Sequence, residues 1–214
     1  MYVAVATLQS SAITSGLEQI VYNIAESEQE GTWPECEGSI EQCLKDKDMA
    51  LQIVGLRCLR EVCRAHHQKL DEERKALHAI AERFLPQLEH LFGQVSADGG
   101  NPHQMDVMVL ILKIFFFLNY SGISPCLIQP GRIRPWIEFM VQILDATQDS
   151  GNPLVKWTDN LSEIQKLDKE PWWQLKAICA KNSLRLYQKY LVDNVSKKDQ
   201  EGKKRLKSRL HMTD

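Results

Sequence analysis

Apolar side chains recur at the period of an α-helix through almost the whole sequence. In the first clear example, apolar residues stand at positions i, i+3, i+4, i+7 and i+8, which gives a helix one buried face: Leu17, Ile20, Val21, Ile24 and Ala25. No segment shows the alternation of apolar and polar residues that is typical of a strand. The sequence therefore predicts an all-α fold.

Proline, glycine and aspartate mark the ends of the expected helices. Asp46 and Asp48 have the side chains that cap a helix N-terminus, and residues 97–102 form a glycine-rich break between two expected helices. We expect Pro86 to kink the helix that contains it. The residues from Met105 to Tyr120 are apolar almost all round, which predicts a helix buried on several sides. Further helices are expected at about 35–45, 49–62, 71–95, 133–146 and 171–191.

The helices read as successive pairs that begin near Ile13, Met49, Gln104 and Pro171. A helix pair cannot bury both of its faces alone, so stacked pairs are the economical arrangement. This pattern predicts an α-solenoid of antiparallel pairs, of the HEAT or armadillo kind, and a compact helical bundle is the alternative. We expect residues 1–192 to form the solenoid with three to four pairs, and a polar insert at 147–170. Trp136 and Phe116 should lie between neighbouring pairs. Residues 193–214 would be a basic tail or the start of a further repeat helix.

Charge and cysteine usage limit the partners and the cellular compartments that the sequence suggests. The formal net charge of -2 gives no electrostatic attraction to nucleic acid or to an anionic membrane. The longest apolar run, from Val107 to Leu118, is interrupted by Lys113 and is too short to span a bilayer. Six scattered cysteines without a signal peptide are typical of a reducing compartment. These features predict a soluble intracellular protein.

The best metal-binding candidates are two cysteines and two histidines near the end of one expected helix. Cys63 and His67 would share a helix face, but Cys58 points away from it, and no second pair completes a tetrahedral site with His66. We interpret these residues as two core cysteines and a solvated histidine pair. The sequence predicts no metal site.

Signatures of catalysis are absent from the sequence. It contains no nucleophile elbow, no glycine-rich phosphate loop and no recognised cysteine signature. Carboxylates such as Glu72 and Glu73 lie in charged helix faces, where solvation explains them. Trp172 and Trp173 would pin the start of a helix by packing, with a ligand cage as the alternative. We predict a protein that is not an enzyme and has neither catalytic residues nor a cofactor.

The expected insert is the best candidate for a partner-binding segment. It carries five carboxylates against three lysines (Lys156, Lys166 and Lys169): Asp149, Asp159, Glu163, Asp168 and Glu170. Such a long polar segment could dock a basic partner or serve as a solvated linker. The basic tail could be a localisation signal or a nucleic-acid patch, but Leu206 and Leu210 favour an amphipathic helix.

Several segments together resemble the importin-beta superfamily, and most closely its importin seven and importin eight group. These segments are a "KIF" helix at 112–118, a "W-I" helix at 136–140 and an acidic stretch that ends in Pro171-Trp172-Trp173. Upstream, Thr32-Trp33-Pro34 and the "EER…FLP-x-L" pattern at 72–88 match in the same order. The export receptor for importin-alpha shares the "KIF" segment and a segment like Leu186 to Tyr190, so the subgroup stays open.

The resemblance implies a HEAT-repeat receptor that carries protein cargo between cytoplasm and nucleus. Receptors of this family bind cargo on a concave surface, are switched by the GTPase Ran and contact nucleoporins. The sequence lacks a match to their N-terminal Ran-binding region, so we expect an internal fragment, roughly the second to the fifth repeat, or a shortened relative. A general HEAT scaffold of another complex is the alternative function.

Overall fold

The computed structural model describes residues 11–28, 33–68, 74–97, 102–145 and 171–192. Within these ranges the structure is helical and contains no strand, which confirms the predicted all-α class. The helices are α2 (Ser11–Ser27), α3 (Pro34–Lys45), α4 (Met49–His66), α5 (Lys75–Ala97), α6 (Pro102–Leu118), α7 (Pro125–Ile128), α8 (Arg134–Asp145) and α10 (Pro171–Leu186), followed by the π-helical turn η4 (Tyr187–Val192). The expected tail at 193–214 lies outside the described residues.

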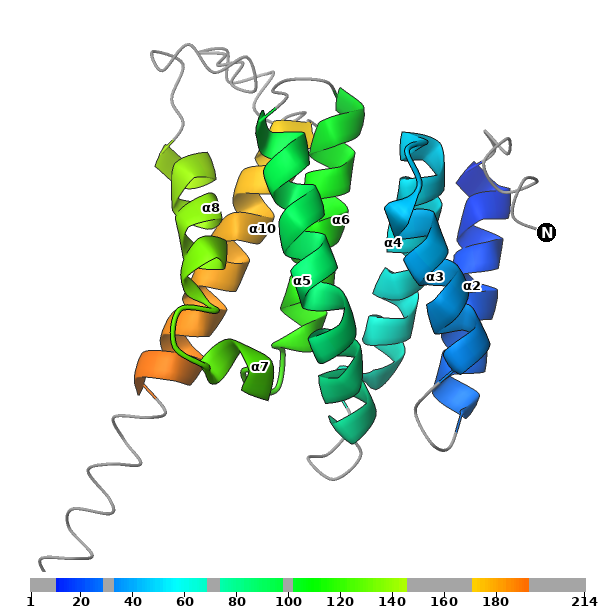
Figure 1. The fold of residues 1–214 in the computed structure, drawn as a ribbon, viewed down its shortest axis with the longest axis horizontal. Coiled ribbons are helices and arrows are strands. Elements are labelled where there is room, and N and C mark those ends of the chain that lie inside the picture. Colours follow the sequence, from blue (N-terminus) through cyan, green and yellow to red (C-terminus); the bar gives the residue numbers. More distant parts are fainter. Residues whose placement is uncertain (1–10, 29–32, 69–73, 98–101, 146–170, 193–214) are drawn as a thin grey trace, which may run out of the picture.

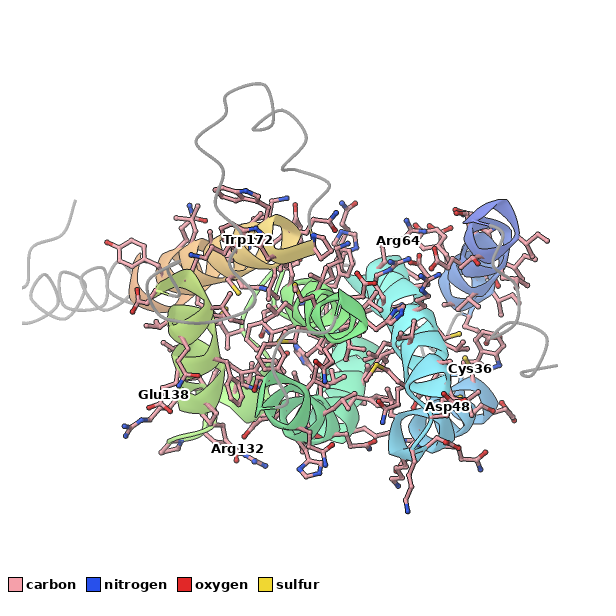
Figure 2. The ribbon with its side chains drawn as sticks, turned by 90° about the horizontal axis from the view of Figure 1, so that it is seen from above. Cys36, Asp48, Arg64, Arg132, Glu138 and Trp172 are labelled. Carbon is pink, nitrogen blue, oxygen red and sulfur yellow. The ribbon has the colours of Figure 1, made fainter. Side chains whose placement is uncertain are left out.

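The helices form two layers (Figures 1 and 2). The long layer contains α2, α4, α6 and α10, in which each helix packs on the next. The short layer contains α3, α5 and α8, which run in the direction opposite to the long layer (Figure 1). The first helix, α2, and the last, α10, lie at opposite ends of the long layer (Figure 2). This order is the predicted solenoid of stacked antiparallel pairs and not a closed bundle.

The predicted pairing of the helices is wrong by one helix. The antiparallel pairs that share extensive contacts are α3 with α4, α5 with α6, and α8 with α10. The predicted pairs would have joined α2 to α3 and α4 to α5, but α4 packs on α2, α3 and α6 and only slightly on α5. Glycine and proline breaks do not distinguish a turn within a pair from a linker between pairs. The register therefore depends on which apolar faces fit together.

Close approach of α3 and α4 depends on a glycine. A Cβ atom added at Gly55 would lie 2.8 Å from the Cβ of Cys43 and 3.3 Å from the carbonyl oxygen of Ile40. The turn that joins the helices is capped as predicted. The carboxylate of Asp48 accepts a hydrogen bond from the Ala50 amide (2.9 Å), and Asp46 accepts one from the Asp48 amide (2.8 Å). A tight turn and a missing side chain thus fix this pair.

Helix α6 is the centre of the core, as its all-round apolar sequence predicts. It packs against α4 and α10 in its own layer and against α5 in the other. From Gln104 to Leu118 only Asp106 is exposed and only Lys113 and two phenylalanines are half-buried. The side chain of Asn182 on α10 donates a hydrogen bond of 2.9 Å to the carbonyl of Leu112, so a polar bond joins α6 and α10 inside the core.

Aromatic rings join the last helix pair to the one before it. Trp136 of α8 is fully buried and stacks on Phe115 of α6, with the ring centroids 4.5 Å apart. Phe92 of α5 lies on the same tryptophan at 6.4 Å. The expected position of Trp136 between neighbouring pairs is therefore confirmed. Phe115 makes this contact, whereas the rings that Phe116 meets belong to Phe117 and Tyr120.

Ion pairs connect the first two helices of the short layer. Arg83 of α5 lies 2.9 Å from Glu37 and 2.7 Å from Glu41, both on α3. Hydrogen bonds from Lys45 and Arg83 lower the pKa of Glu41 to about 2. The short α7, which begins at Pro125, is absent from the prediction. The turn between α7 and α8 contains Gly131, whose φ of 81° favours glycine. Pro86 lies inside α5, and the kink expected there stays a prediction.

The apolar face of α2 is only partly covered, contrary to the expectation of five buried residues. Ala25 is buried and Leu17 and Val21 are half-buried, but Ile20 is 54% exposed and Ile24 is 37% exposed. The helix packs on α4 along one edge, and no described helix covers the rest of its apolar face. Helical periodicity identified the face correctly but could not tell how much of it the neighbouring helices cover.

Replacing Trp136 with alanine should destabilise the fold far more than replacing its neighbour Ile137. The tryptophan change empties a buried site shared by three helices, so we expect a loss of about 3–5 kcal/mol in the free energy of unfolding. Ile137 is 43% exposed, and its change to alanine should cost about 1 kcal/mol or less. Urea denaturation followed by circular dichroism measures both values. Similar losses would contradict the stacking of α8 on α6.

Candidate partner-binding surface

The five predicted partner-binding carboxylates lie outside the described residues. They are Asp149, Asp159, Glu163, Asp168 and Glu170, in the segment 146–170 between α8 and α10. Their role therefore stays a prediction.

The start of α10, just after these carboxylates, is described, and there the packing interpretation of the tryptophan pair is confirmed. Trp172 is buried, and the rings of Trp172 and Trp173 stack at 4.8 Å.

The four candidate metal ligands take separate roles in α4 and its C-terminal turn. Cys63 is fully buried in the core, and Cys58 is half-buried on the side of α2 and α3. His66 is buried, contrary to the expectation of a solvated histidine pair, while His67 packs its ring against Phe117 and Tyr120 of α6. In the described part of the chain, no three His, Cys, Asp or Glu side chains converge in a way that could hold a metal ion.

An ion-pair network covers the junction of α2 and α4. Glu18 of α2 pairs with Arg60 at 2.9 Å and with Arg57 at 3.7 Å. Glu61 pairs with Arg60 at 2.5 Å and with Arg64 at 2.6 Å. The three arginines follow one face of α4 at spacings of three and four residues, and Arg64 projects from the outer side of the long layer in Figure 2. Two carboxylates are thus shared among three guanidinium groups.

The charge that interrupts the apolar sequence of α6 faces the same side. Lys113 is half-buried, and no carboxylate of the described residues lies within 4 Å of its ammonium nitrogen. Burial lowers the pKa of Lys113, and the charges of Arg60 and Lys181 lower it further, while Asp106 and Glu18 act in the opposite direction. Lys113 therefore lies between a cation on α4 and a cation on α10.

This charged surface was not predicted from the sequence. The spacing of Arg57, Arg60 and Arg64 was a usable signal, since it places the three on one side of a helix. In the sequence, Lys113 stands out only because it interrupts an apolar run. Its proximity to Arg60 and Lys181 depends on how three helices pack, which a single sequence does not reveal.

An apolar groove of about 270 Å³ lies between α2, α3 and α4. Its walls include Ile20, Ile24, Trp33 and two thiols, Cys36 and Cys58. Cys36 lies between α2 and α3 in Figure 2. Burial raises the pKa of Cys36 to about 12 and that of Cys58 to about 11, so both thiols stay protonated near neutral pH. The groove offers hydrophobic contact and not nucleophilic chemistry.

Exposed apolar side chains gather at the two ends of the solenoid. Among the described residues, large apolar side chains that are well exposed lie on α2, on the last elements α8, α10 and η4, and at Ile128 of α7. The middle pair of α5 and α6 has none of them. Solenoids normally shield their terminal repeats with a polar outer face. Both described ends instead have the apolar character of a stacking surface.

The chain is similar to part of each of several much longer proteins. Nonsense-mediated mRNA decay protein 5 of Saccharomyces cerevisiae is 29% identical over 163 residues, which cover 74% of this chain and 15% of that protein. Importin-8 of Mus musculus is 24% identical over 75% of this chain and 15% of its own length. The importin beta-like SAD2 homolog of Arabidopsis thaliana is 27% identical over 74% of this chain and 14% of its own length.

The chain is thus similar to proteins of the importin-beta superfamily over about three quarters of its length. Neither a protein-family model nor a solved structure matches it. The matched region spans about 15% of the length of these superfamily relatives. None of the described helices has both the length and the apolarity to cross a membrane.

Glu61→Gln should destabilise the fold more than Glu138→Gln. The Glu61 side chain is 1% exposed and joins two arginines, so its loss leaves charges without their partner, at a cost of about 2 kcal/mol. Glu138 pairs with Arg134 at 2.7 Å but is 53% exposed, and its change should cost less than about 0.5 kcal/mol. Urea denaturation at neutral pH measures both variants. Equal effects would show that the network on α4 contributes no more than an exposed ion pair.

Proposed function

We propose that this chain is a protein-binding segment of a nuclear transport receptor, which carries protein cargo between cytoplasm and nucleus. The observation that supports the proposal most is its similarity to Importin-8 and to the importin beta-like SAD2 homolog, over about three quarters of the chain. The helical-repeat fold, stacked in two layers, agrees with this origin. The chain contributes contact surfaces to the receptor and performs no reaction.

The long layer supplies the surface for binding in this proposal. Its helices lie side by side and run in one direction, so side chains at matching heights form rows across several helices (Figures 1 and 2). Rows of this kind let an extended partner contact three or four helices at once. Association with Ran and nucleoporins belongs to the complete receptor, and is proposed on the basis of the resemblance alone.

The acidic residues of the 146–170 segment are proposed as a second contact for cargo. Asp149, Asp159, Glu163, Asp168 and Glu170 would attract a basic segment of the cargo at long range. Electrostatic attraction of exposed charges acts mainly on the association rate and fades as salt is added. This contact would speed the association of cargo more than it would stabilise the bound complex.

Two other functions are compatible with the same fold. A general HEAT scaffold would hold the components of an assembly together without responding to a nucleotide. An export receptor for importin-alpha would gain affinity for its partner when Ran·GTP is present, whereas an import receptor would lose it. The response to Ran·GTP therefore separates the three functions.

Proteins bound to the complete gene product should exchange when Ran loaded with a non-hydrolysable GTP analogue is added. The purified protein is immobilised with partners from cell extract, and release or recruitment of those partners is measured by quantitative mass spectrometry. Ran loaded with GDP is the control. An importer predicts release, an exporter predicts recruitment, and no change with either nucleotide would contradict a transport function and favour the scaffold.

The same preparation tests the acidic segment. With its five carboxylates changed to amides, release by Ran·GTP should persist, while capture of basic cargo at low salt should become slower. An unchanged rate of capture would mean that the segment is only a linker.

A further inference from the structure

Three cations lie in a row across three neighbouring helices of the long layer. They are Arg60 on α4, Lys113 on α6 and Lys181 on α10, and they are called the cationic row below. Each stands ten or eleven residues after the first residue of its helix, and the three helices run in the same direction (Figure 1). The three helices also begin near the same edge of the layer (Figure 1), and each residue of an α-helix rises by about 1.5 Å, so the three residues lie at similar heights.

A buried hydrogen bond fixes the neighbouring positions of two of these cations. The amide of Asn182, which follows Lys181, donates to the carbonyl of Leu112, which precedes Lys113, at 2.9 Å. Asn182 and Leu112 are both almost fully buried, so α6 and α10 cannot slide past each other without breaking this bond. The register of the two lysines is therefore part of the core.

The cationic row has fewer carboxylates than it needs for neutrality. Arg60 shares Glu18 and Glu61 with Arg57 and Arg64, whereas Lys113 and Lys181 have no carboxylate of the described residues within 4 Å. Asp106 lies close enough to Lys113 to oppose the effect of its cationic neighbours, but it is exposed and forms no ion pair within 4 Å with the described cations. Like charges at close range favour the binding of an anion between them.

We propose that the cationic row binds an acidic, extended segment of a partner protein. This inference rests on the proposed protein-binding function and names the chemistry of the partner at that surface. Packed helices lie about 10 Å apart, so neighbouring cations of the row are separated by about that distance. A polyproline II segment rises about 3.1 Å per residue and presents every third side chain on one side. An acidic residue at every third position therefore matches the row.

Nucleic acid fits this surface less well than an acidic peptide does. Glu18 and Asp106 lie beside the row and would repel a continuous phosphate backbone, whereas a peptide can place uncharged residues opposite them. The chain as a whole has a formal net charge of -2, which gives no long-range attraction for a polyanion. The spacing of isolated cations selects isolated carboxylates.

Binding is tested on the full 214-residue chain with three fluorescent probes at low ionic strength. The probes are a peptide of four Glu-Ser-Pro repeats, the matched Lys-Ser-Pro peptide and a single-stranded oligothymidine. Fluorescence anisotropy gives the affinity of each. We expect the acidic peptide to bind, the lysine peptide not to bind, and the oligothymidine to bind more weakly than the acidic peptide.

A double variant identifies the site. Lys113→Met with Lys181→Gln should lower the affinity for the acidic peptide roughly five- to tenfold, because two charge contacts are lost. Lys113→Arg with Lys181→Arg should retain binding. The matched control, Lys45→Met with Lys47→Gln, removes the same charge at the end of α3 and in the turn after it, and should leave the affinity unchanged. Circular dichroism verifies that each variant is folded.

Three results would overturn the proposal. They are unchanged affinity in the Lys113 and Lys181 double variant, equal binding of the lysine peptide, and tighter binding of the oligothymidine that depends on the same two lysines. The last result would assign the cationic row to nucleic acid.

These outcomes are independent of the Ran·GTP experiment. Partner exchange with Ran·GTP but no effect of the lysine variants would leave the transport function standing and remove the acidic partner. No partner exchange with Ran·GTP, together with weaker peptide binding by the lysine variant, would retain the peptide site and remove the transport function.

Discussion

Burial of α6 on three sides is the constraint on which the rest of the structure depends. A helix this apolar is stable in water only when neighbours cover it, and α4, α5 and α10 do so. Each of these helices belongs to a different pair, so one central helix holds three pairs together. Trp136 adds α8 through its stack on Phe115. Stacking of the pairs follows from the need to bury α6.

The same constraint places charge on the surface of the long layer. Since its neighbours cover most of α6, only the side that bears Asp106, Lys113 and Phe117 remains partly open. A lysine on that side must lie between the adjacent helices and beside whatever charges they present. Arg60 and Lys181 are those charges. Packing of the core therefore brings together cations that are far apart in the sequence, and this is how the fold creates a surface for a partner.

Sequence reasoning predicted what depends on local pattern. It gave the helical class, the caps at Asp46 and Asp48, the buried character of α6 and the position of Trp136 between pairs. It failed where the answer depends on which faces meet. The pairing was wrong by one helix, because breakers look alike within pairs and between them. Ile20 and Ile24 were expected to be buried and are exposed, because periodicity finds an apolar face but not its partner.

The predicted and the observed binding surfaces differ for a related reason. Acidic residues at 149–170 stand out in the sequence because they are close together along the chain, although they lie outside the described residues. The cationic row takes one residue from each of three helices, and only the register of α4, α6 and α10 assembles it. The two surfaces have opposite charge, so they would suit different segments of a partner.

Native-state hydrogen exchange on the full chain tests most directly whether α6 holds the structure together. If it does, amides in the central turns of α6 exchange only when the whole protein unfolds, and their free energy of opening equals that from urea denaturation. Amides of α2, which packs mainly on α4 and has two exposed isoleucines, should exchange through a cheaper local opening. If amides of α6 exchanged as readily as those of α2, the central helix would not be what holds the pairs together.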